Sequence, residues 1–292
     1  MQKCCLKATS RAGNGKMGEQ ILYKYLDITG AKCMIGNSNL QFTNATQLND
    51  PFDCHPNLID FDSKTKDSRP GIHKQWAMEI EENRAFNRRN DTWLCSLSKI
   101  NDSILMWSHY CRNHSGVCIG LNMGKVRESY PPLFGSLMIH PVTLEVQYQD
   151  LIEHHEDGNS WFYQWQTKAK PWEYEQEVRL VIAKPSGMYA ALTPEQAKRK
   201  DIIDWKEIRH YLPLKGECFE SIYFGINTKA EDKEKIINYA LTYVNPNLKV
   251  YQMTVDEKAF RLKPVLEDAK VTKKPRKIKM KSKKIYKTFR MM

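Results

Sequence analysis

The chain has 292 residues, and its 41 % apolar and 11 % aromatic content is enough to form a hydrophobic core. No apolar run is long enough to span a bilayer, and the first residues lack the apolar stretch of a signal peptide. Eight cysteines are scattered without a C-x-x-C pair, a pattern typical of reduced thiols. We therefore expect a cytoplasmic protein without membrane contact.

The net charge of +11 is concentrated at the C-terminus. Residues 269–292 hold eleven basic residues and no acidic one, and the rest of the chain holds 34 basic and 34 acidic residues. Such a segment is usually disordered and attracts polyanions, or it only adds solubility. We predict a flexible N-terminus over 1–19, one folded domain over 20–263 and a disordered basic tail over 264–292 that binds nucleic acid. The tail residues predicted to make this contact are Lys273, Lys274, Arg276, Lys277 and Lys279.

The first elements are predicted from strand-forming residues and one strong turn. Strands are expected over 21–26 and 40–43, with a turn or short helix between them. The sequence N-D-P-F-D at 49–53 then gives a turn signal. We expect the side chain of Phe52 to hold this loop against the domain.

The middle of the chain is predicted to alternate between helices and strands. A charged amphipathic helix is expected over 76–88, with Trp76, Ile80 and Phe86 toward the core. Further strands are expected over 92–98, 116–121 and 144–148, and further helices over 103–112 and 160–169.

The last part of the chain is predicted to close the domain with a strand, a helix and a strand. They are expected over 221–226, 229–244 and 248–255, after an irregular segment over 184–215 that holds a short helix from Pro194. Thr228 and Glu231 have the spacing of a capping box for the helix. Together the elements indicate one α+β domain.

The stretch K-P-W-E-Y-E-Q-E-V-R-L-V-I-A at 170–183 carries the strongest functional signal. As a strand, it places Glu173, Glu175, Glu177 and Arg179 on one face, because successive side chains alternate. Three carboxylates and a guanidinium at this spacing need water or partners. Such a face can line a cleft where a carboxylate performs chemistry, or it can be a solvated face with a weak ion pair.

Other kinds of site have weaker support. Two histidines and two cysteines lie close together, but their spacing, H-x-C-x2-H-x3-C, fits no zinc framework. These residues are His109, Cys111, His114 and Cys118. The glycine motifs that bind phosphates or dinucleotides are absent from the sequence. We expect no bound metal, although the glutamates at 173–177 leave a metal-dependent nuclease as an alternative.

Three short strings resemble a large bacterial family of unknown function that is met among abortive-infection and phage-defence genes. They are N-D-P-F-D at 49–53, M-W-S-H-Y at 106–110 with a downstream H-x-G, and W-x-x-E-x-E-x-R at 172–179. The strings follow the order of that family, and the likeness covers about 23–260. The resemblance implies a role in phage defence, with an antitoxin or another defence protein as partner.

The order of elements also resembles the ADP-ribosyltransferase fold, in particular the DarT-type toxins that modify DNA. E-V-R-L-V at 177–181 is similar to the string that carries their catalytic glutamate at the start of an apolar strand. C-S-L-S at 95–98 and E-Q-E at 175–177 are similar to the S-x-S strand and E-x-E pair of other transferases of this fold. The resemblance implies a split, mostly antiparallel sheet flanked by helices. Y-K-Y at 23–25 departs from the pattern, since a His or Arg is usual there.

This second resemblance implies roles around NAD as co-substrate. Glu177 would hold the ribose 2′-hydroxyl and stabilise the positive charge that develops when the nicotinamide–ribose bond breaks. Glu175 would orient or deprotonate the acceptor, and Arg179 would pair with a pyrophosphate or with Glu177. The remaining expected contacts are the cofactor-binding residues Tyr25, Ser96 and His109 and the substrate-loop residues Asn49 and Asp50.

The sequence therefore predicts a toxin-type enzyme that transfers ADP-ribose from NAD to nucleic acid or, less favoured, to protein. Two alternatives stay open at this point. One is a nuclease that uses a divalent metal on the acidic strand, and the other is a non-catalytic module that binds nucleic acid through the basic tail.

Overall fold

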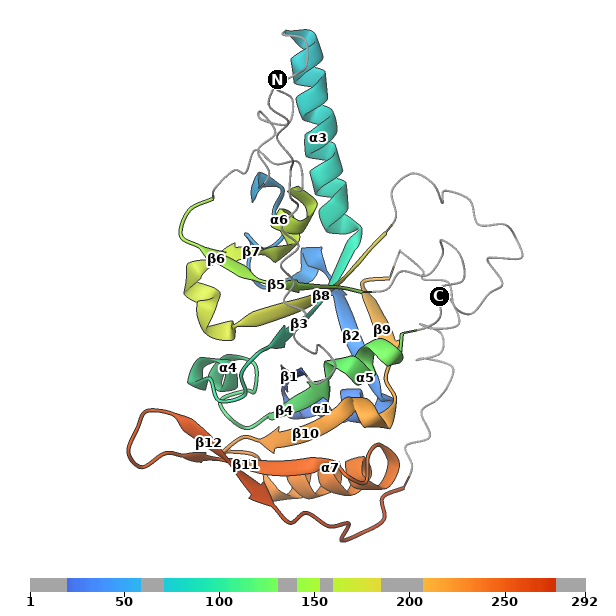
Figure 1. Cartoon of the computed structure of the whole chain (residues 1–292), viewed down its shortest axis with the longest axis vertical. Coiled ribbons are helices and arrows are strands. Elements are labelled where there is room, and N and C mark those ends of the chain that lie inside the picture. Colours follow the sequence, from blue (N-terminus) through green and yellow to red (C-terminus); the bar gives the residue numbers. More distant parts are fainter. Residues whose placement is uncertain (1–19, 59–70, 131–140, 153–159, 185–206, 277–292) are drawn as a thin grey trace, which may run out of the picture.

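The computed structural model describes residues 20–58, 71–130, 141–152, 160–184 and 207–276, and Figure 1 shows their arrangement. The strands are β1 (Ile21–Leu26), β2 (Asn39–Asn44), β3 (Thr92–Ser98), β4 (Val117–Asn122), β5 (Val142–Glu145), β6 (Gln147–Gln149), β7 (Thr167–Ala169), β8 (Glu177–Ala183), β9 (Arg209–Pro213), β10 (Phe219–Phe224), β11 (Lys249–Val255) and β12 (Leu262–Glu267). The α-helices are α1 (Ile28–Asn37), α3 (Ile72–Asn90), α4 (Ile104–His109), α5 (Met123–Glu128), α6 (Ser160–Gln166) and α7 (Ala230–Tyr243). Short 3-10 helices are η1 (Ala45–Gln47), η2 (Pro56–Leu58), η4 (Lys170–Glu175) and η6 (Gly216–Cys218). In this part of the chain no helix is both long and apolar enough to cross a membrane.

One large sheet runs through the molecule. Its strand order is β12-β11-β10-β4-β1-β3-β2-β9, and β8 pairs with both β3 and β5. The pairs are antiparallel except β10 with β11, which α7 connects as a crossover. β6 and β7 form a separate small sheet. The prediction of an α+β domain with a mostly antiparallel sheet is confirmed.

Helices pack against both faces of this sheet. The larger core holds buried residues of β1, β3, β4, β8 and β10 together with the apolar sides of α1 and α7. On the other face, Trp107 of α4 is fully buried and packs edge-on against Tyr25, with the ring centroids 5.5 Å apart. The indole N–H of Trp107 donates to the carbonyl oxygen of Asn101 at 2.7 Å, so this buried polar group is satisfied.

The strands β1 and β3 diverge, and this divergence positions the site. β1 pairs with β4 at six successive residues, but it pairs with β3 only through Tyr23 and Ser98. Farther along β3, Lys24 Nζ donates to the carbonyl oxygen of Ser96 at 2.8 Å. A lysine side chain thus satisfies a backbone acceptor that lies away from the β1–β3 pair.

Several residues predicted to be buried lie on the surface. Helix α3 extends away from the sheet, and its Trp76, Ile80 and Phe86 are 60 %, 52 % and 58 % exposed. Phe52 is 61 % exposed, and its neighbours Asp53 and Cys54 are buried instead. The predictions for Trp76, Ile80, Phe86 and Phe52 are wrong. In the helix, a periodic pattern shows which residues share a face but not whether another element covers it. In the loop, the neighbouring Asp53 is the buried residue, and it pairs with Arg179.

Some element boundaries differ from the predictions for local reasons. The helix predicted over 103–112 ends at His109, since Arg112, Asn113 and His114 have positive φ angles of 47°, 54° and 60°. The helix predicted over 160–169 ends at Gln166, where β7 begins. The strand predicted over 144–148 is two strands, β5 and β6.

The C-terminal part also differs from the prediction. Thr228 does not cap α7; its hydroxyl donates to the carbonyl oxygen of Gly116 at 3.0 Å. The domain continues through β12 to Glu267, and the backbone N–H of Thr272 donates to Asn238 Oδ1 of α7 at 2.9 Å. The predicted tail therefore includes a segment that packs on the domain. The helix predicted from Pro194 and the residues 1–19 and 277–292 lie outside the described residues.

Candidate functional site

The stretch over 170–183 does not form one strand. Its first half is η4, which Gln176 ends in a left-handed conformation with a φ of 43°, and β8 begins only at Glu177. Glu173 lies in η4 and is exposed, so the prediction that it shares a face with the other carboxylates is wrong. Glu175 and Glu177 lie on either side of the turn at Gln176, and both contact one buried lysine.

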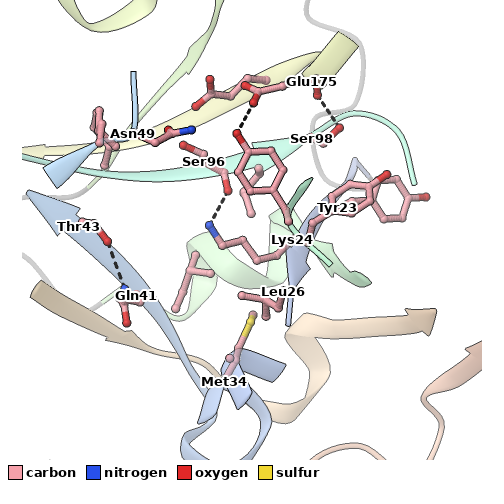
Figure 2. A pocket seen from close by; sticks show the side chains of 18 of the residues that line it. Tyr23, Lys24, Leu26, Met34, Gln41, Thr43, Asn49, Ser96, Ser98 and Glu175 are labelled. Carbon is pink, nitrogen blue, oxygen red and sulfur yellow. Dashed lines mark hydrogen bonds between the residues drawn. The ribbon is translucent and has the colours of Figure 1, made fainter. Parts of the chain in front are cut away.

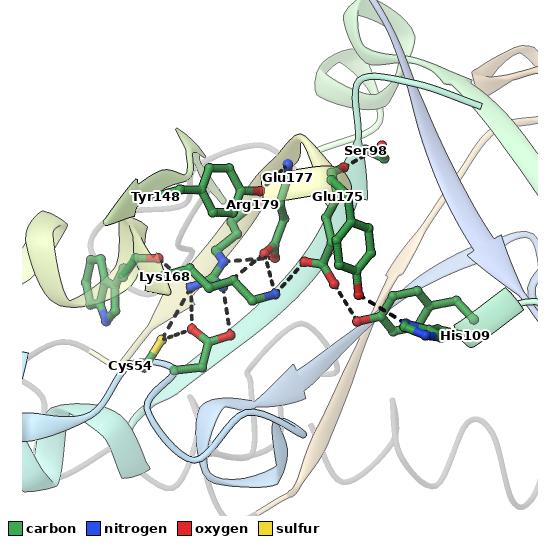
Figure 3. A network of polar contacts seen from close by, with 12 residues as sticks. Cys54, Ser98, His109, Tyr148, Lys168, Glu175, Glu177 and Arg179 are labelled. Carbon is green, nitrogen blue, oxygen red and sulfur yellow. Dashed lines mark hydrogen bonds and ion pairs between the residues drawn. The ribbon is translucent and has the colours of Figure 1, made fainter. Parts of the chain in front are cut away.

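Lys168 of β7 lies between these two glutamates (Figure 3). Its Nζ forms ion pairs with Oε2 of Glu175 and with Oε2 of Glu177, the second at 3.1 Å. The three residues are only 6 %, 3 % and 4 % exposed. The ammonium also lies over the ring of Trp172, 4.8 Å from its centroid. Because buried charges are costly unless they are paired, Lys168 fixes both carboxylates at the same place.

Arg179 holds the other side of Glu177. Its Nε donates to Glu177 Oε1 at 2.9 Å and its Nη2 to Glu177 Oε2 at 3.0 Å. The same guanidinium pairs with Asp53, at 2.7 Å and 2.8 Å, and donates to the carbonyl oxygen of Trp165 at 2.8 Å. Arg179 was expected to pair with a pyrophosphate or with Glu177. In the structure it is fully buried and pairs with Glu177. The loop at 49–53 is therefore held to β8 by an ion pair.

Three hydroxyl groups orient the backbone and side chains of the glutamates. Tyr110 donates to Glu175 Oε1 at 2.5 Å, and Ser98 Oγ donates to the carbonyl oxygen of Glu175 at 2.7 Å. The backbone N–H of Glu177 donates to the hydroxyl of Tyr148 at 2.8 Å. The two carboxylates are thus fixed by neighbouring groups on several elements, as a preorganised site requires.

The two carboxylates are shifted in opposite directions. Burial raises the pKa of Glu175. The charge of Lys168 lowers this pKa and that of Glu177 raises it, and the net shift is upward. Burial also opposes ionisation of Glu177, but Arg179 and Lys168 outweigh it, and with a hydrogen bond from Ser96 they hold its pKa well below the usual range. Burial lowers the pKa of Lys168, but the two glutamates outweigh it, so its pKa is raised and the ammonium stays charged.

Glu175 and Glu177 line a cavity of about 810 Å³, part of which Figure 2 shows. This volume lies within the range of about 300–1,000 Å³ typical of small-molecule sites. The cavity lies where β1 diverges from β3, beside α1, β2 and β9. Its polar lining includes Lys24, Gln41, Thr43, Asn49, Asp53, Ser96, Ser98, Tyr110, Lys168 and Arg209.

The residues predicted to bind a cofactor are only partly brought together. Ser96 lines the cavity, and its side chain helps to lower the pKa of Glu177. Tyr25 also lines it, but the ring is buried against α4 and its hydroxyl donates to the carbonyl oxygen of Ile100 at 3.0 Å. His109 lies outside the cavity lining, with Nδ1 3.0 Å from the hydroxyl of Tyr174.

The predicted substrate loop contributes one residue to the cavity. Asn49 lines it near Tyr110, where its side chain acts to lower the pKa of the tyrosine hydroxyl. Asp50 is buried in the loop, where its Oδ1 accepts from the backbone N–H of Phe52 at 2.9 Å. This contact forms the turn, which is the ordinary role of an aspartate before Pro.

Sequence reasoning missed Lys168, Tyr110 and Asp53. Lys168 was placed in a predicted helix, and only the short strand β7 and the turn of η4 bring it back to the glutamates. Tyr110 and Asp53 lie in the strings M-W-S-H-Y and N-D-P-F-D, so those strings mark the right segments. One sequence signal could have pointed to a partner such as Asp53. Arg179 lies in an apolar strand, and a guanidinium buried there needs more than one acceptor.

Two further predictions concern the tail and metal binding. Lys273, Lys274 and Arg276 are exposed, whereas Lys277 and Lys279 lie outside the described residues. In the described ranges, no group of three or more His, Cys, Asp or Glu residues is arranged to hold a metal ion.

Comparison with known proteins bears on the same segment. Residues 106–180 match the model of a family described as Protein of unknown function (DUF2971). Comparison with curated proteins and with solved structures gave no match. The matched segment begins at Met106 of M-W-S-H-Y and ends one residue after Arg179, so it contains two of the three strings and both site glutamates. Over this segment the chain is thus similar to a family of unknown function.

Proposed function

We propose that the cavity binds NAD and transfers its ADP-ribose group to a nucleic acid, or less favourably to a protein, within a phage-defence role. The observation that carries this proposal is the pair Glu175 and Glu177. They line one cavity, and their surroundings shift their pKa values apart. Two carboxylates with opposite shifts are the usual basis for dividing an acid–base role from an electrostatic one.

Glu177 takes the electrostatic role. Its lowered pKa keeps it ionised at neutral pH. When the bond between the ribose C1′ and the nicotinamide nitrogen breaks, the electron pair leaves with neutral nicotinamide and positive charge develops on the ribose. A fixed carboxylate beside that carbon stabilises the charge and can accept a hydrogen bond from the 2′-hydroxyl.

Glu175 takes the proton-transfer role. The acceptor oxygen or nitrogen forms the new bond to C1′, and its proton passes to Glu175. A raised pKa makes this carboxylate a better base than an exposed glutamate. Lys168 remains protonated between the two groups and keeps both of them in place.

The register of the sheet supports this proposal. Tyr23 of β1 lies opposite Ser98 of β3, and Ser98 lies opposite Glu177 at the start of β8. The S-x-S and E-x-E strings that resemble transferases thus lie side by side on β3 and at the start of β8, with Y-K-Y, which departs from the pattern, on β1 beside them. A glutamate at the first position of an apolar strand is also the place expected from that resemblance.

The nuclease alternative is less well supported. Lys168 and Arg179 lie against Glu177, and Lys168 also lies against Glu175, so a divalent metal ion bound there would lie beside two cations of the protein, which would repel it. Glu173, the third expected ligand, is exposed in η4, away from the buried pair. NAD turnover that continues in EDTA would separate the transferase from a nuclease that needs a divalent ion.

The raised pKa of Glu175 predicts the pH dependence of transfer. A base must be deprotonated, so the rate falls as the pH drops through the pKa of Glu175. Because that pKa is raised above the ordinary value of about 4.3, the acid limb of kcat lies above this value. Glu177 stays ionised over the same range and does not contribute. A pH profile of kcat tests this, and an acid limb that persists unchanged in Glu175→Gln would contradict it.

Replacing Lys168 by Met should move this acid limb to higher pH. The ammonium lowers the pKa of both glutamates, and without it two buried carboxylates face each other. The limb should therefore lie at higher pH in Lys168→Met than in the wild type. A matched control is Lys170→Met, because within the described residues the ion pair of Lys170 is an exposed one with Asp150. Identical profiles for the wild type and Lys168→Met would show that Lys168 does not tune the site.

A further inference from the structure

The cavity has a second wall that the proposed chemistry does not use. It is formed by β2 and β9, where Thr43 lies opposite Arg209 and Gln41 lies opposite Tyr211. Side chains alternate along a strand, and directly paired residues point to the same face, so these four share one face. All four line the cavity that the two glutamates also line.

The chemistry of this wall matches the parts of a nucleotide. Arg209 is exposed and lines the cavity, and its planar guanidinium is suited to binding a phosphate through two parallel hydrogen bonds. Tyr211 is half-buried and offers a ring on which a base can stack. Gln41 Nε2 donates to Thr43 Oγ1 at 3.2 Å (Figure 2), and the amide oxygen of Gln41 remains for the edge of a base.

The position of this wall sets the size of the ligand. β8, β3, β2 and β9 are successive neighbours in the sheet. Three strand spacings of ~4.8 Å place Arg209 roughly 14 Å across the sheet from the strand of Glu177. Lys24, whose Nζ donates to the carbonyl oxygen of Ser96 on β3, adds a further cation to a cavity lining that already holds Lys168 and Arg209. A ligand that reaches both ends is thus longer than one sugar ring and carries negative charge at a distance from the reacting carbon.

We propose that the β2–β9 wall is a nucleotide-binding subsite, in which Arg209 binds a phosphate and Tyr211 stacks on a base. The inference deepens the proposed function, on which it rests for the identity of the reaction. The nucleotide can be the adenylate part of the co-substrate or a residue of a single-stranded nucleic acid. Both present the same phosphate and base, and the experiment distinguishes them.

The test is binding of AMP and of a short single-stranded DNA to the full chain, measured by calorimetry. Arg209→Gln and Tyr211→Leu should each weaken binding at least tenfold, whereas Tyr211→Phe keeps the ring and binds like the wild type. Lys263→Gln is the matched control, because Lys263 is an exposed strand cation on β12, outside the cavity lining. Weakening of AMP binding assigns the wall to the co-substrate, and weakening of DNA binding alone assigns it to the acceptor.

Glu177→Gln separates this inference from the proposed function. This variant should retain nucleotide binding and lose NAD turnover. If the wild-type protein binds AMP through Arg209 but does not consume NAD, only the proposed function is overturned. The inference is overturned if neither probe binds the wild type, or if Arg209→Gln binds both probes as the wild type does. A melting curve shows whether Tyr211→Leu folds. If it does not, binding by Arg209→Gln alone decides the outcome, because Arg209 is exposed.

Discussion

Replacing Glu177 by Gln is expected to lower kcat for nicotinamide release from NAD by about a hundredfold to a thousandfold, the range typical of removing one preorganised electrostatic contact. The amide keeps the shape of the side chain but loses the negative charge that, in the proposed reaction, stabilises the ribose cation. The KM for NAD should change far less, because the lost interaction is made mainly in the transition state. Steady-state kinetics with purified protein measure both values.

Glu173→Gln provides the matched control for this variant. Glu173 belongs to the same acidic stretch but is exposed in η4, where it contacts neither Lys168 nor Arg179. Its kcat should equal that of the wild type. Equal losses in both variants, or full activity in Glu177→Gln, would remove Glu177 from the catalytic role.

Replacing Arg179 by Leu is expected to lower the free energy of unfolding by about 3–5 kcal/mol, the cost of breaking a buried ion pair on one side. Arg179 is fully buried and pairs with both Glu177 and Asp53, so its removal takes this cation from Asp53 and leaves Glu177 with Lys168 alone. Urea denaturation followed by circular dichroism measures the change. For comparison, Lys184→Met removes a half-exposed ion pair with Asp91 and should cost less than about 1 kcal/mol.

The difference between Arg179→Leu and the wild type should also depend on pH. Since Arg179 lowers the pKa of Glu177 in the folded state, this stabilisation is fully present above the unfolded value of about 4.3. It is lost as the pH falls toward the lower pKa of the folded state. A difference in unfolding free energy that stays constant from neutral pH into acid would show that the pair with Glu177 does not carry the effect.

Regular strands of this fold were predictable from local pattern. The strands at 21–26 and 92–98 have the predicted boundaries, because β-branched and aromatic residues there meet both local propensity and burial. β9 was missed, since R-H-Y-L-P is short, polar and ends in Pro. Only its pairing with β2 makes it a strand.

The candidate site was predictable in its acidic half. Glu175 and Glu177 stood out because carboxylates at two-residue spacing before an apolar run need partners. Their actual geometry depends on the left-handed turn at Gln176, which strand alternation does not anticipate. Lys168 contacts them only through the tertiary structure, so no local pattern marks it.

We propose above that this cavity cleaves the nicotinamide–ribose bond of NAD. The most direct test is nicotinamide release from ribose-labelled NAD by the purified chain, with DNA, RNA or cell lysate as acceptor and with EDTA present. We expect loss of NAD that depends on Glu177, with the label transferred to one acceptor. No NAD consumption with any acceptor, or consumption that Glu177→Gln retains in full, would contradict it.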